Sequence, residues 1–167
     1  MLRLVRPGIS FAVAALAAGL GAAPAPARAN IGDTMPQLRQ RYGSAKDMGG
    51  QMLFEVRIRD GQITPARGAT DTENHFTITV YFDGVNSGME VFTRNTSDPA
   101  KAELTQADID TILAATSEGL QWERIQVPSG KPTWVRSDKK IIARFSPNKT
   151  GKVEDASVLV IMLYTER

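Results

Sequence analysis

The chain has no cysteine, and its single histidine is His75. The lack of thiols excludes thiol catalysis, thiol redox chemistry and thiolate metal sites. There is also no Gly-x-Ser-x-Gly motif to present a nucleophilic serine, and the glycines lack the spacing of a phosphate-binding loop. The sequence therefore predicts a protein that is not an enzyme and that uses no cofactor.

Long apolar runs are equally scarce. The run from Ile9 to Leu20 is shorter than the roughly 20 apolar residues that span a bilayer. It follows Arg3 and Arg6 and precedes Ala27-Arg28-Ala29, the layout of a cleavable signal peptide. We therefore predict a signal peptide over residues 1–29 and export to the periplasm or the medium. The alternative is a retained membrane anchor, whereas a lipid anchor would need a cysteine after the run.

Removal of this segment changes the charge balance of the protein. The segment carries three basic residues and no acidic ones, so the remaining 138 residues have a net charge of −1. The basic isoelectric point of the precursor is thus no indication of nucleic-acid binding. A chain of this length predicts one domain over residues 30–167.

Hydrophobic periodicity predicts an α+β fold with two short helices and an antiparallel sheet. Helices are expected over 35–42, capped by Thr34, and from Thr105 to about Thr116, where Asp108 completes a capping box. Residues 64–74 are expected to form a loop. The expected order is α-β-β-β-α-β-β-β(-β), with strands over residues 52–59, 76–82, 89–93, 122–127, 133–136, 141–145 and 158–165.

The two halves of this pattern begin alike. Each helix starts at a threonine, continues with apolar side chains four and eight residues later, and is followed by a strand. The matching residues are Thr34, Leu38, Tyr42 and Phe54 in the first half, and Thr105, Ile109, Leu113 and Trp122 in the second. One interpretation is an internal duplication, and the other is coincidence between two ordinary helix-to-strand units.

The segment from residue 124 to residue 152 carries eight basic side chains and one acidic side chain. Within it, strand alternation places Trp122 beside Arg124 and Trp134 beside Arg136, on strands that should pair. An aromatic ring next to a guanidinium is common on binding surfaces, so we predict a binding site. Its residues are Trp122, Arg124, Trp134, Arg136 and Arg144. The alternative is that the tryptophans border the core and the arginines form a solvated face.

A second hypothesis concerns His75. In an extended segment Asp71, Glu73 and His75 would share one face, and their oxygen and imidazole groups would suit a divalent metal. The protein would then be a metal-binding protein or a small hydrolase that uses His75. The alternative is a polar loop that leads into the following strand.

Two resemblances accompany these patterns. Gly32-Asp33-Thr34 through Arg41-Tyr42-Gly43, followed by a strand, resembles the opening of the SmpA/OmlA (BamE-like) family, and the Asp83-Gly84 strand is similar to that family's later strands. The resemblance implies a small periplasmic domain with a helical start and an antiparallel sheet. The chain departs from that family because the lipid-attachment cysteine is missing and the second helix of that family is not evident in this sequence.

If the duplication is real, the whole chain resembles the tandem beta-lactamase-inhibitor-protein fold. Trp134-Val135-Arg136-Ser137-Asp138 also resembles a segment of uncharacterised secreted bacterial proteins. We therefore expect an exported binding domain whose partner is a protein or an anionic envelope polymer, with the hydrolase or metal-binding protein as the alternative.

Overall fold

The computed structural model describes residues 31–59, 62–66, 75–150, 152 and 155–164. The predicted signal peptide, residues 1–29, lies outside the described residues, as do Asp71 and Glu73. No helix in the described part is long and apolar enough to cross a membrane.

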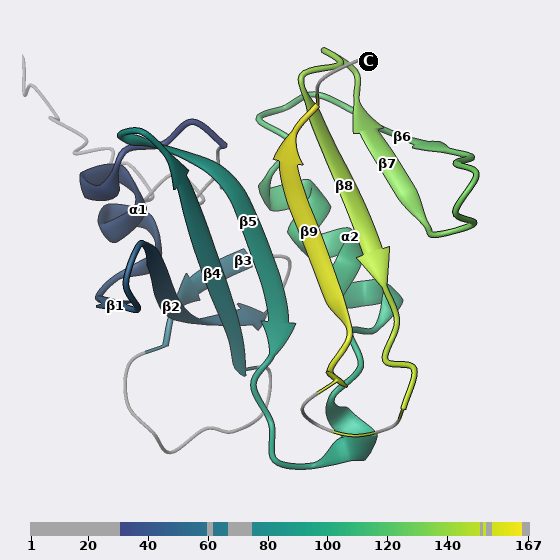
Figure 1. The fold of residues 1–167 in the computed structure, drawn as a ribbon, viewed down its shortest axis with the longest axis horizontal. Helices are drawn as coiled ribbons and strands as arrows, with labels where there is room; N and C mark the ends of the chain where they lie inside the picture. Colours follow the sequence, from purple (N-terminus) through teal and green to yellow (C-terminus); the bar gives the residue numbers. More distant parts are fainter. Residues whose placement is uncertain (1–30, 60–61, 67–74, 151, 153–154, 165–167) are drawn as a thin grey trace, which may run out of the picture.

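The described chain forms a nine-stranded antiparallel sheet with two α-helices, which confirms the α+β prediction (Figure 1). The helices are α1 (Met35–Tyr42) and α2 (Gln106–Ala115), and a short 3₁₀ helix, η1 (Pro99–Lys101), precedes α2. The strands are β1 (Ala45–Asp47), β2 (Gln51–Arg59), β3 (Gln62–Pro65), β4 (His75–Asp83), β5 (Asn86–Arg94), β6 (Trp122–Ile125), β7 (Thr133–Arg136), β8 (Ile141–Ser146) and β9 (Val158–Leu163).

The strand order is symmetric about the β5–β9 pair. It runs β1-β2-β4-β5-β9-β8-β7-β6, and β3 pairs with β2 outside this path. Each half thus begins with a helix and contributes four neighbouring antiparallel strands to this path, with β3 as an additional strand in the first half. A duplication would produce such an arrangement. The sequence pattern matched the Trp122 strand of the second half with the Phe54 strand of the first half. In the sheet, the Trp122 strand is β6, and its position corresponds to β1 rather than to the Phe54 strand, β2. The reason is that β1 and β6 each follow a helix and each lie at an edge of the sheet.

Two strands were not predicted. β1 pairs with Met52 to Phe54, and β3 pairs with Val56 to Arg59, so both lie along the same edge of β2. Both are short and largely polar, and neither has the alternation that marks a half-buried strand. The prediction of a loop over residues 64–74 was wrong at its start, because residues 64 and 65 are the last two of β3. Pro65 is tolerated there because β3 is an edge strand.

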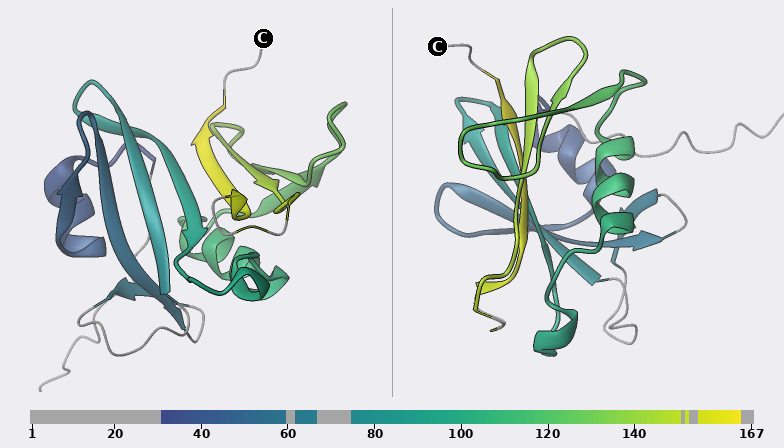
Figure 2. Two further views of the ribbon diagram at one scale, coloured as in Figure 1. Left: turned by 60° about the horizontal axis from the view of Figure 1, so that its bottom comes forward. Right: turned by 90° about the vertical axis from the view of Figure 1, so that its right-hand side faces the viewer.

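Both helices pack on one face of the sheet, here called the inner face. Leu38 and Tyr42 of α1 and Ile109, Ile112 and Leu113 of α2 belong to one hydrophobic cluster with the inward side chains of both halves. Both expected threonine caps form capping boxes, with Gln37 for α1 and Asp108 for α2. Figure 1 shows α2 behind β8 and β9, and the right-hand view of Figure 2 shows both helices on the same side of β5 and β9.

A fully buried acidic side chain lies within this core. Glu90 of β5 points to the inner face and is fully buried. Tyr42 donates a hydrogen bond from Oη to Glu90 Oε2 at 3.1 Å, while Glu90 Oε1 has no hydrogen-bond partner among the described residues. Burial raises the pKa of Glu90 from 4.5 to about 7; Tyr42 and the nearby Arg41 act in the opposite direction, and Asp33 adds to the increase. Glu90 is therefore protonated more readily in the folded chain than in the unfolded chain.

This shift predicts a dependence of stability on pH. The stabilisation from protonated Glu90 is complete below the unfolded pKa of 4.5 and is lost as the pH rises through the folded pKa of about 7. Between pH 4.5 and pH 8 the free energy of unfolding should fall by on the order of 3 kcal/mol from this group alone. Glu90→Gln should remove that part of the dependence. Urea titrations of both proteins across this range measure it, and parallel pH profiles would contradict the assignment.

Candidate functional site

The structure confirms the expected pairing of the two tryptophan-containing strands. β6 and β7 are antiparallel, with Trp122 opposite Arg136 and Arg124 opposite Trp134. Trp134 also lies opposite Ala143 of β8, which in turn lies opposite the buried Ile161 of β9. All four side chains therefore lie on the inner face, the face that carries the helices.

Trp134 and Arg136 are interior residues. Trp134 is 9% exposed and belongs to the hydrophobic core, and Arg136 is 4% exposed. Arg136 forms ion pairs with Glu118 and Asp138, and Nη1 also donates to the carbonyl oxygen of Thr116. The hydrogen bonds from Arg136 hold the pKa of Asp138 below its usual value. These contacts join the end of α2 to β7, so neither side chain is available to an outside partner.

The other three predicted binding residues have different surroundings. Trp122 is half-buried and donates from Nε1 to the carbonyl oxygen of Leu113 at 2.7 Å, which fastens β6 to α2. Arg124 is exposed, and its guanidinium lies 5.9 Å from the centre of the Trp134 ring. Arg144 lies on the opposite face of the sheet, where it pairs in register with Thr133 and Val160. The five residues therefore do not form one surface.

His75 begins β4 and lies opposite Arg57 of β2. Its Nε2 is 3.7 Å from Glu55 Oε2, whereas the other two candidate ligands, Asp71 and Glu73, fall outside the described residues. Within residues 31–59, 62–66, 75–150, 152 and 155–164 there is no group of three acidic or histidine side chains that could hold a metal ion.

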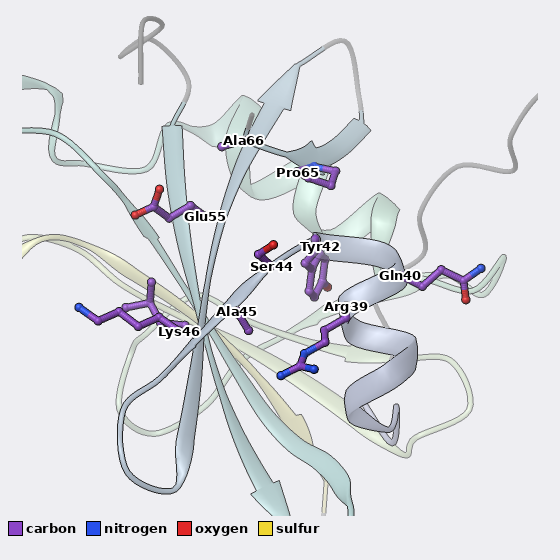
Figure 3. Close-up of a pocket in the computed structure, with 11 residues that line it drawn as sticks. Arg39, Gln40, Tyr42, Ser44, Ala45, Lys46, Glu55, Pro65 and Ala66 are labelled. Carbon is purple, nitrogen blue, oxygen red and sulfur yellow. The ribbon is translucent and has the colours of Figure 1, made fainter. Parts of the chain in front are cut away.

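A pocket of about 500 Å³ lies at the edge of the sheet, between the end of α1 and the neighbouring ends of β1 and β3 (Figure 3). Its polar lining combines Arg39 and Lys46 with Glu55 and Ser44. The hydroxyl of Ser44 makes no side-chain hydrogen bond within the described chain, so no base activates it there. Tyr42 also lines the pocket, but burial raises its pKa well above 10, which keeps the phenol neutral. The arrangement does not assemble a nucleophile with a base.

The face opposite the helices is the larger feature, and we call it the open face. Figure 1 looks onto it, and no helix lies in front of β4, β5, β9 and β8. From β2 to β6 its central row is Leu53, Thr79, Val91, Val160, Arg144, Thr133 and Ile125. The adjacent row is Gln51, Tyr81, Met89, Met162, Ile142, Val135 and Glu123.

The open face is apolar at its centre and polar at its sides. Met89, Val91, Val160 and Met162 are half-buried although neither described α-helix covers them, and Tyr81 is 39% exposed. Gln51 and Glu55 on β2 and Glu123 on β6 supply polar side chains at the two sides. An apolar centre with a polar rim is the arrangement of protein-binding surfaces.

These placements predict which substitutions on the inner face destabilise the fold. Trp134→Ala should lower the free energy of unfolding by about 3–5 kcal/mol, because it removes a buried ring from the core. Arg124→Ala, on the same face but exposed, should change it by no more than about 0.5 kcal/mol. Urea denaturation followed by circular dichroism measures both, and a Trp134→Ala protein as stable as the parent would contradict the core position of this ring.

A comparison of the chain with protein-family models, with curated proteins and with solved structures finds no match. The assignment of a function therefore rests on the geometry of the chain itself.

Proposed function

We propose that this chain is an exported, non-enzymatic binding domain that holds a partner protein on the open face of its sheet. The observation that carries the proposal is the apolar central part of a broad sheet face, formed by Met89, Val91, Val160 and Met162, that no described helix covers. Large apolar areas on the outside of a protein commonly mark interaction sites. The predicted signal peptide supports export.

The shape of the surface favours a protein over a small molecule. Small ligands bind in concave pockets that enclose most of their surface. The open face instead extends across β4, β5 and β9 to Arg144 of β8, with side chains in register from strand to strand. Beyond Arg144, Thr133 and Val135 of β7 are already buried within the chain, as is Ile142 of β8. Such a face offers many shallow apolar contacts, and its borders carry the hydrogen-bonding groups of Gln51, Glu55 and Glu123.

The position of the titratable groups supports a binding role as well. Glu90, whose pKa is raised to about 7, and its partner Tyr42 lie in the core on the inner side of the sheet. A substrate on the open face would lie across the sheet from both groups. The side chains of the central row on that face are aliphatic or threonine, apart from Arg144.

Site-specific photo-cross-linking tests the proposal. A benzoylphenylalanine in place of Tyr81, on the open face, is compared with the same group in place of Leu120, in the turn between α2 and β6. The two side chains have the same exposure, 39%, so the comparison is matched. In the cells that produce the protein, the Tyr81 position should give a discrete heavier product that contains a second protein, and the Leu120 position should not.

Three results would contradict the proposal. Equal cross-linking from both positions would mean that the open face is not selective. A diffuse product that is polymer rather than protein would favour an anionic envelope polymer as partner. No product from the Tyr81 position, with efficient folding of the labelled chain, would mean that the open face stays unoccupied.

A further inference from the structure

Arg144 is the one charged side chain in the central row of the open face. It projects from β8 between Val160 of β9 and Thr133 of β7, and Ile142 and Ser146 flank it along its own strand. Each of these four neighbours is uncharged. The side chain is half-buried, and its Nε is shielded from solvent without a hydrogen-bond acceptor.

Three other shielded arginines of the described chain form ion pairs with carboxylates. Arg41 is paired with Asp33, Arg94 with Asp108 at 2.6 Å, and Arg136 with both Glu118 and Asp138. Arg144 differs from these three, because no carboxylate of the described residues forms an ion pair with it. A shielded Nε without an acceptor does not by itself set Arg144 apart, because the Nε of Arg94 is in the same state. The difference is the ion pair: Asp108 neutralises the Arg94 guanidinium, and no described carboxylate does this for Arg144.

The nearest carboxylates on this face belong to other strands. Glu55 lies on β2 and Glu123 on β6, at the two sides of the sheet, and neither forms an ion pair with Arg144. Among the described residues, Arg144 is thus a positive charge without an ion-pair partner inside an apolar surface. An occupant that covered the surface without supplying a negative charge would bury that cation unpaired, which is strongly unfavourable.

We infer that the partner protein inserts an aspartate or glutamate side chain against Arg144, surrounded by apolar residues that cover Val91, Val160 and Met162. This inference rests on the proposed function of the open face. A carboxylate would accept charge-assisted hydrogen bonds from the guanidinium, and the aliphatic surroundings would exclude water from the pair. The apolar rows supply contact area, and Arg144 selects the partner, because a neutral or basic residue at that position would be rejected.

Selection from a random peptide library displayed on phage tests the inference without a known partner. The library is selected against the purified protein, and binding peptides are mapped by the NMR methyl shifts of Val91, Val160 and Met162. Peptides that shift these methyl groups should be enriched in aspartate or glutamate. Replacing that acid by its amide should weaken binding by roughly thirtyfold or more.

Two variants complete the experiment. Arg144→Glu should lose the acidic peptides and bind versions in which the acid is replaced by lysine, a reversal that a damaged fold could not produce. Arg124→Glu, the same charge change on the inner face, should leave both affinities unchanged. If Arg144→Glu does not fold, Arg144→Gln is tested with the same peptides. It should lose binding of the acidic peptides without gaining binding of the lysine versions.

The outcomes separate the inference from the proposed function. Peptides that shift the methyl groups but show no preference for an acid, or that bind Arg144→Glu equally well, would overturn the role of Arg144 and leave the open face as a binding surface. Selection that yields no peptide on these methyl groups would overturn both.

Discussion

The antiparallel pairing of β5 with β9 is the contact on which the rest of the structure depends. It joins the two halves, each with its own helix, into one sheet, and it brings the inward side chains of both halves into a single hydrophobic cluster. Phe92 lies opposite Leu159 in this pair, and both are fully buried. Half of the sheet with one short helix has little apolar area to bury by itself, so the shared core gives each half a stability that it would lack alone. The open face is a product of the same pairing, because Val91 and Val160 meet only where the halves join.

Much of the fold could be predicted from the sequence, because the long strands carry a clear pattern. The alternation of Met52, Phe54, Val56 and Ile58 against charged residues predicted β2, and the apolar positions on both sides of β9 predicted a central strand. β1 and β3 could not be predicted in this way. They are short and mostly polar, and they are strands because β2 offers them unpaired backbone groups.

The candidate site was harder to predict, for a physical reason. Strand alternation placed Trp122, Arg124, Trp134 and Arg136 on one face, but it could not say which face α2 would cover, since that depends on the packing of the whole chain. The open face had no pattern of its own in the sequence, because its residues come from strands that are far apart along the chain. Glu90 illustrates the same limit. A glutamate between Met89 and Val91 would ordinarily point outward, but the sheet places it in the core and turns Val91 to the open face.

The two borders of the sheet have a consequence for assembly. β1 is three residues long with Lys46 and Asp47 exposed, β3 ends in a proline, and β6 at the other border exposes Glu123 and Arg124. Short, charged or proline-containing borders discourage the addition of a further strand from another molecule. Copies of this protein at high local concentration are therefore disfavoured from joining edge to edge into a continuous sheet, while the broad side of the sheet stays accessible.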